Sequence, residues 1–173
     1  MFSQVIDWHK TKHPKYTLGN QPNEFSRQYL INLCESILRP VSQQFGDVTV
    51  TYGFTSTDLY RYLQKNSPKN TAAEIDQHAS MEHNSKGNRI CKRDGAACDF
   101  LVEGYENRMA EVARYITAEL HYDRLYFYGN DKPIHVSIGP DNSRYALIRE
   151  TRPDGLRVNK KSGTGDNANA LFL

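Results

Sequence analysis

Three short candidate strands follow one another near the C-terminal end of the chain, over residues 124–128, 133–138 and 144–149. A strong turn signal, Gly139-Pro140-Asp141-Asn142, joins the last two. The helical patterns lie earlier in the sequence. A run of strands at one end of a chain is typical of the α+β class, so we predict an antiparallel or mixed sheet with helices packed on it.

Two amphipathic helical patterns precede these strands. Apolar residues recur every three to five positions over residues 23–45, where Pro40 predicts a kink or break, and again over residues 105–121. Between the two helices, the alternation over residues 48–52 and the apolar run over residues 96–102 each predict a further strand.

Polar segments separate and follow these elements. Ser56 is expected to cap a short helix, after which residues 66–94 have few large apolar side chains and form a long inserted loop. Residues 151–173 are rich in Gly, Asn, Lys and Asp, which predicts a flexible C-terminal tail. A chain of 173 residues is the usual size of one domain. We therefore expect a single domain over residues 1–150.

Charge and cysteine content bear on partners and location. The 22 lysines and arginines nearly balance 20 aspartates and glutamates, giving a formal net charge of +2, well below that of most nucleic-acid binders. Three cysteines cannot all pair, which favours a reducing compartment. The first 13 residues lack the apolar core of a signal peptide, and no run approaches the roughly 20 apolar residues that span a bilayer. We expect a cytoplasmic protein that does not contact membranes.

Three residues stand out as candidates for chemistry. Strand alternation places His135 and Ser137 opposite the apolar face of their strand. Asp99 interrupts an apolar strand, where a carboxylate needs a partner. His78 begins the polar loop, and two histidines with one aspartate are a ligand set for catalytic zinc. Taken alone, a strand histidine is more often exposed or satisfied, and this spacing is a weak signal.

The order of motifs resembles the M15 family of zinc peptidases, which includes D-alanyl-D-alanine carboxypeptidases and phage peptidoglycan peptidases and shares its fold with the hedgehog signalling domain. The resemblance covers roughly residues 16–149. The segments that carry it are Leu38 through Gly46, Val48 through Ser56, Asp76-Gln77-His78, Gly95 through Asp99, Tyr122 through Tyr128 and Ile134 through Ser137.

The resemblance implies zinc held by His78, Asp99 and His135, and metal-assisted amide hydrolysis of a cell-wall peptide. It also suggests a phage-encoded protein that is released at lysis. It also implies that the substrate lies beside a further set of residues, namely Thr55, Ser56, Tyr128 and Ser137.

The chain departs from the family pattern at three places. Twenty residues separate His78 from Asp99, and this insertion supplies His83 as an alternative first ligand. Thr55 replaces the arginine that follows the family's glycine turn. The family's general base, a glutamate, falls on Tyr128 or Lys132.

These departures leave the general base and the function open. Asp76 and Glu82 are candidate substitutes for the base. The alternative function is a catalytically altered or inactive module that binds an anionic ligand or a protein partner through the basic cluster of the loop, which comprises Lys86, Arg89, Lys92 and Arg93. The expectation of a nucleic acid or nucleotide partner is based on this cluster alone.

Overall fold

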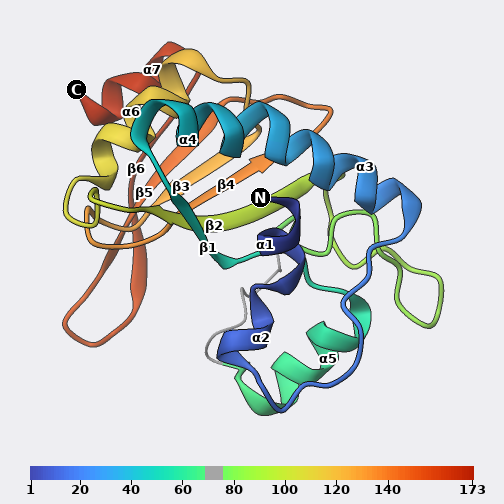
Figure 1. Ribbon diagram of the computed structural model, residues 1–173. Helices are drawn as coiled ribbons and strands as arrows, with labels where there is room; N and C mark the ends of the chain where they lie inside the picture. The colour runs from blue at the N-terminus through green and yellow to red at the C-terminus, as the bar shows by residue number, and fades with distance from the viewer. Residues whose placement is uncertain (69–75) are drawn as a thin grey trace.

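The computed structural model describes residues 1–68 and 76–173, which form one α+β domain built on a six-stranded sheet (Figure 1). The sheet order is β1-β2-β4-β3-β5-β6, and all neighbours are antiparallel except β3 and β5. The strands are β1 (Val48–Tyr52), β2 (Ala96–Val102), β3 (Arg124–Phe127), β4 (Ile134–Ile138), β5 (Tyr145–Thr151) and β6 (Arg157–Thr164). The predicted class, a mixed sheet with helices packed on it, is confirmed.

Helices cover one face of this sheet and leave part of the other open. A long helical segment and a second helix lie across the covered face, while three short helices gather beside β1 at the opposite side (Figure 1). The first group comprises α3 (Glu24–Leu33), the π-helical η1 (Cys34–Leu38), α4 (Arg39–Phe45), α6 (Met109–Glu119), α7 (Asp166–Asn169) and the 3-10 turn η3 (Ala170–Phe172). The second group comprises α1 (Phe2–Asp7), α2 (His9–Lys12) and α5 (Thr57–Asn66).

The two central strands show how strand alternation separates core from site. On β2, Cys98 and Phe100 are fully buried in the main core, and on β4 Val136 joins them. Their neighbours along the two strands, Asp99 on β2 and His135 on β4, point to the opposite face because successive side chains alternate along a strand. The apolar helices therefore seal one face, and the polar side chains of β2 and β4 are left on the other.

The helix over residues 23–45 continues through Pro40 instead of breaking. Asn23 caps its start by accepting a hydrogen bond from the Ser26 amide at 2.8 Å. Proline has no N–H, so it cannot make the usual helical bond to a carbonyl four residues earlier. The turn ahead of it widens, and the Arg39 amide bonds to the Cys34 carbonyl five residues back. The kink is thus absorbed as a π-helical turn.

Of the loop predicted over residues 66–94, Asn66 is the last residue of α5, residues 76–94 form a loop, and residues 69–75 lie outside the description. The loop over residues 76–94 contains turns and one isolated bridge, between His83 and Arg89. It is nonetheless fixed to the domain, because Ala79 and Cys91 are buried in a small apolar cluster of their own.

The prediction of a flexible tail after residue 150 is wrong. Strand β6 pairs with β5 along its whole length, and Ala168 of α7 is fully buried in the main core. The ring of Phe172 contacts Phe127 edge to face, with centroids 5.4 Å apart. The proposed boundary at residue 150 falls inside β5. Polar composition was misleading because β6 lies at the sheet edge, where most of its side chains face water.

The turn over residues 139–142 exists, but it does not make a hairpin. β3 lies between β4 and β5 and runs parallel to β5. Asp123, just before β3, secures this crossing by accepting hydrogen bonds from the amide and hydroxyl of Ser143 at 3.1 and 2.6 Å.

None of the helices within the described residues combines the length and apolar character that crossing a bilayer requires.

Candidate metal centre

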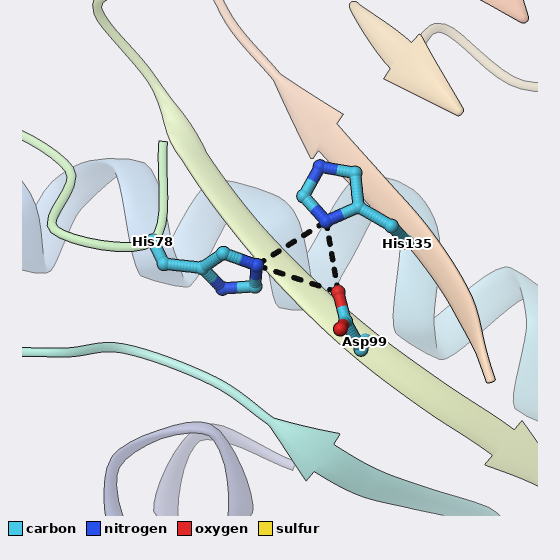
Figure 2. A group of neighbouring side chains, drawn as sticks. All are labelled: His78, Asp99 and His135. Atoms are coloured by element: carbon cyan, nitrogen blue, oxygen red, sulfur yellow. Dashed lines mark hydrogen bonds and ion pairs between the residues drawn. The ribbon is translucent and has the colours of Figure 1, made fainter. Parts of the chain in front are cut away.

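Three polar side chains from separate parts of the chain converge on the open face of the sheet (Figure 2). Asp99 and His135 are direct cross-strand partners on β2 and β4, so the register of these strands brings them together. His78 comes from the turn that follows the undescribed residues and reaches the same point from the side. These are the three residues that the zinc peptidase resemblance implies.

The three ligand atoms have the spacing of a metal site. His78 Nε2 lies 3.3 Å from Asp99 Oδ1 and 3.2 Å from His135 Nδ1, and the latter two atoms are 2.8 Å apart. In a tetrahedral site with bonds of about 2.0–2.2 Å, ligand atoms lie about 3.3–3.6 Å from each other. A small opening of the Asp99 and His135 pair reaches that spacing. The buried cluster can therefore hold a metal ion.

The backbone sets the orientation of His78. Its Nδ1 lies 3.2 Å from the carbonyl oxygen of Gly53, which can only accept a hydrogen bond. Nδ1 therefore donates to this carbonyl, and Nε2 is the ring nitrogen that faces Asp99 and His135. A side chain at position 53 would place its Cβ 2.2 Å from the Val5 carbonyl oxygen. Only glycine therefore allows the backbone at position 53 to lie this close to Val5.

His135 is held by a ring on one side and a carboxylate on the other. Tyr126 stacks on it with the planes 13° apart and the centroids separated by 4.8 Å. Its Nε2 is buried and, among the described residues, has no hydrogen-bond partner. Asp76 Oδ2 lies 3.6 Å from this nitrogen. When Nδ1 binds a metal, Nε2 carries the hydrogen and Asp76 is placed to accept it, as in many carboxylate–histidine–metal arrangements.

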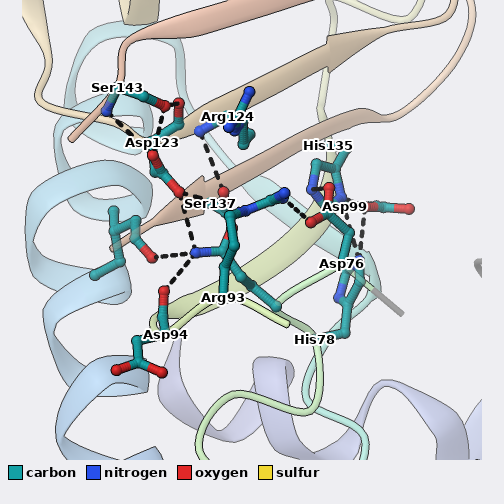
Figure 3. A network of polar contacts seen from close by, with 12 residues as sticks. Asp76, His78, Arg93, Asp94, Asp99, Asp123, Arg124, His135, Ser137 and Ser143 are labelled. Carbon is teal, nitrogen blue, oxygen red and sulfur yellow. Dashed lines mark hydrogen bonds and ion pairs between the residues drawn. The ribbon is translucent and has the colours of Figure 1, made fainter. Parts of the chain in front are cut away.

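Arg93 fixes this carboxylate (Figure 3). Its guanidinium pairs with Asp76 Oδ1, and its Nε lies 3.8 Å from Asp123 Oδ2. Gln77 links Asp123 to the loop, since its side-chain nitrogen contacts Asp123 Oδ2 at 3.2 Å and the Asp94 carbonyl at 2.6 Å. The loop and the sheet therefore share one polar network around the cluster.

The surroundings keep Asp99 ionised and the nearby tyrosines protonated. Burial would raise the pKa of Asp99, but hydrogen bonds from His135 and His78 outweigh it and hold this pKa well below its usual range. Burial, followed by the charge of Asp99, raises the pKa of Tyr128 to about 12. Burial also raises the pKa of Tyr126. The charge of Asp99 acts on Tyr128 and that of Asp76 acts on Tyr126, so near neutral pH both hydroxyls stay protonated.

The cluster opens into a pocket of about 1210 Å³ on the uncovered face of the sheet. Asp76, Asp99 and His135 lie at its floor beside Tyr126 and Tyr128. The far side comes from β5 and β6, and the near side from α2 and the end of α5. Residues of these walls are Lys12, His13, Tyr62, Asn66, Leu147, Arg149, Arg157 and Asn159.

Several predicted site residues lie elsewhere. Of the four expected to contact substrate, only Tyr128 lines the pocket. Thr55 is fully buried, and its backbone amide supports His78 by donating a hydrogen bond to the His78 carbonyl at 3.0 Å. Ser56 caps α5 by accepting from the Leu59 amide. Ser137 is buried, and its hydroxyl accepts from the Arg124 amide at 3.2 Å.

The two alternatives in the loop are also displaced. Glu82 Oε1 accepts hydrogen bonds from the Asn23 amide and the Ser26 hydroxyl, both at 2.8 Å, so this carboxylate anchors the loop to the start of α3. His83 is exposed and bridges to Arg89 through its backbone, away from the cluster. The structure thus favours His78 over His83 as a ligand, and it removes Glu82 from the site.

Sequence reasoning missed the arginines of the pocket wall. Arg149 and Arg157 were not singled out, because β6 was interpreted as a tail and the end of β5 as its boundary. Arg93 belongs to the basic loop cluster that was expected to bind an anionic ligand or a protein partner, whereas it and Arg89 make intramolecular ion pairs, Arg89 with Asp94 at 2.6 Å. The available signal was the alternation along β5, which puts Leu147 and Arg149 on the same face.

No protein-family model, curated protein or solved structure matches this chain.

Proposed function

We propose that this protein is a zinc-dependent hydrolase of the M15 peptidase type, which cleaves an amide bond in a peptide of the cell-wall kind. The observation that carries the proposal is the convergence of His78 Nε2, Asp99 Oδ1 and His135 Nδ1 at the floor of an open pocket. Two nitrogens and one carboxylate oxygen suit zinc, and three protein ligands leave a coordination position free.

Bound zinc would polarise a substrate carbonyl and lower the pKa of a coordinated water toward neutrality. The chain itself supplies orientation and hydrogen-bond donors. Asp76 orients His135 through Nε2, and Arg93 holds Asp76 in place. The hydroxyl of Tyr128, which occupies a position where the family carries its glutamate, stays protonated and is assigned as a donor to the oxygen that becomes negative during hydrolysis.

Metal binding tests the first part of this proposal. The full-length chain, stripped with chelator and re-equilibrated with zinc, is expected to retain one equivalent after desalting, measured by elemental analysis and competition with a chromophoric chelator. The variant His135→Ala is expected to lose this zinc. His83→Ala is the matched control, because it removes an exposed histidine of the same loop and should retain the metal. A wild-type protein without zinc affinity, or a His135→Ala variant that binds normally, refutes the site.

A second candidate function follows from the engagement of both pocket carboxylates. Among the described pocket residues, the carboxylates are Asp99, which faces the histidines, and Asp76, which is paired with Arg93. Neither is free to act as a general base, a role usually worth about 10² to 10⁴ in rate. This favours a metal-containing module that binds its ligand with little or no turnover.

A panel of peptidoglycan peptides distinguishes the two functions. Cleavage that requires zinc and disappears in Asp99→Asn supports the hydrolase. Saturable binding of the same peptides without cleavage supports the module.

A further inference from the structure

The hairpin of β5 and β6 adds two arginines to the pocket that holds the metal cluster. Arg149 is partly buried on β5, and Arg157 is exposed on β6. Asn159, the cross-strand partner of Arg149, lies two residues beyond Arg157 and shares its face. All three line the same pocket as Asp99 and His135.

Tyr128 connects these arginines to the metal cluster. The Arg157 guanidinium lies over its ring, 4.6 Å from the centroid, and Arg149 is close enough to lower the pKa of its hydroxyl against the effect of burial. The charge of Asp99 also acts on the Tyr128 hydroxyl. A group bound between the arginines would therefore lie beside Tyr128, on the side of the cluster that faces β5 and β6.

The two arginines have no carboxylate partner within the part of the chain described. Their neighbour on the same hairpin, Arg152, pairs with Asp154 at 2.7 Å, and Arg93 pairs with Asp76. The Nε of Arg149 is buried and makes no hydrogen bond to any described residue. A buried guanidinium nitrogen without an acceptor is costly unless a ligand or water supplies one.

The described residues that line the pocket carry excess positive charge. Its lining includes four cationic side chains (Lys12, Arg93, Arg149 and Arg157) and two carboxylates (Asp76 and Asp99). A zinc ion would increase the excess. A concave site of one sign of charge concentrates ligands of the opposite sign, and arginine pairs bind carboxylate or phosphate oxygens through two parallel hydrogen bonds.

We propose that Arg149, Arg157 and Asn159 form a subsite for an anionic oxygen group of the substrate, a carboxylate or a phosphate. We call these three residues the arginine subsite. The inference deepens the proposed function, on which it rests, by restricting its substrates to those with a negative charge near the bond that faces the metal. It also gives the C-terminal hairpin a role in recognition.

Anion binding to the chelator-treated full-length chain tests the subsite independently of zinc. The probes are acetyl-alanyl-alanine with a free carboxylate, the same dipeptide as its neutral amide, and inorganic phosphate. Each is titrated at constant ionic strength and pH 7, and the amide signals of β5 and β6 are followed by NMR. We expect saturable shifts with the carboxylate, the phosphate or both, and none with the neutral amide. The anion that binds more tightly identifies the substrate class.

Single variants locate the binding. Arg157→Ala removes an exposed side chain and is expected to lower the affinity for the anion about tenfold, as loss of a charge-assisted hydrogen bond does. Arg149→Gln should act in the same direction. Arg152→Ala is the matched control from the same hairpin and should bind as wild type does. Absence of binding by both anions, equal binding of the neutral amide, or wild-type affinity in Arg157→Ala and Arg149→Gln overturns the subsite. Because zinc is absent throughout, these outcomes do not depend on the metal site.

Discussion

Replacing Asp76 by asparagine is the sharpest test of how the metal cluster is supported. Asp76 Oδ2 lies 3.6 Å from His135 Nε2, and its other oxygen pairs with Arg93. Asparagine preserves the size of the side chain but removes its negative charge. That charge favours a hydrogen on Nε2 of His135, which leaves the lone pair on Nδ1 of His135 to bind the metal. Changes of this kind beside a metal ligand typically weaken metal binding about 10- to 100-fold. This corresponds to about 1.4–2.7 kcal/mol of binding free energy.

The assay is a competition titration of zinc between the full-length protein and a chromophoric chelator. Asp58→Asn is the control, because Asp58 is an exposed carboxylate on α5 that pairs with Arg61 at 3.5 Å. Circular dichroism of both variants verifies that the fold is retained. The reasoning is refuted when Asp76→Asn binds zinc within about twofold of wild type, a difference of only about 0.4 kcal/mol, or no more weakly than Asp58→Asn does.

Three further predictions concern the loop, the C-terminal hairpin and Asp99. Glu82→Gln should cost about 1 kcal/mol in urea unfolding, because it weakens two hydrogen bonds to the start of α3, and should leave zinc affinity unchanged; a loss of zinc binding would return Glu82 to the site. Deleting residues 151–173 should lower Tm by about 10 °C or more, because it exposes the edge of β5 and removes the buried Ala168, and about 3 kcal/mol shifts a domain of this size by that amount; an unchanged Tm in calorimetry would mean that the segment is a dispensable tail. Hydrogen bonds from the two histidines hold the folded pKa of Asp99 below its unfolded value, near 3.9. The carboxylate therefore stabilises the fold above about pH 4, and this contribution is lost as pH falls toward the folded pKa. The stability difference between wild type and Asp99→Asn, measured by urea unfolding in chelator, should shrink below about pH 4, and a difference that stays constant down to pH 3 would contradict the assignment.

Local pattern was sufficient for the elements that build the floor of the site. The predicted strand over residues 96–102 matches β2 at both ends. Alternation along this strand puts Asp99 on the face opposite its neighbour Cys98, and in the structure Cys98 lies in the core while Asp99 faces the two histidines. These predictions succeed because the period of two is a property of the strand itself and does not depend on which strand lies beside it.

Partner choice was beyond the same reasoning. The turn before Ser143 is present, yet β4 and β5 do not pair, because β3 takes the place between them. A turn signal reports the conformation of four residues, whereas strand order depends on contacts far apart in the chain. The polar edge strand β6 was mistaken for a tail for a related reason, since only its pairing with β5 shows that its backbone is ordered.

By itself, the sequence determined the α+β class, the two faces of the central strands and the types of side chain available for a metal. Only the tertiary structure decided that His78 and not His83 joins Asp99 and His135, that Glu82 anchors the loop, and that Arg149 and Arg157 reach the same pocket. The reason is physical: which face a side chain takes is set by its neighbours along the chain, but a site requires atoms about 3 Å apart from segments many residues apart, and only the packed fold brings them to that distance.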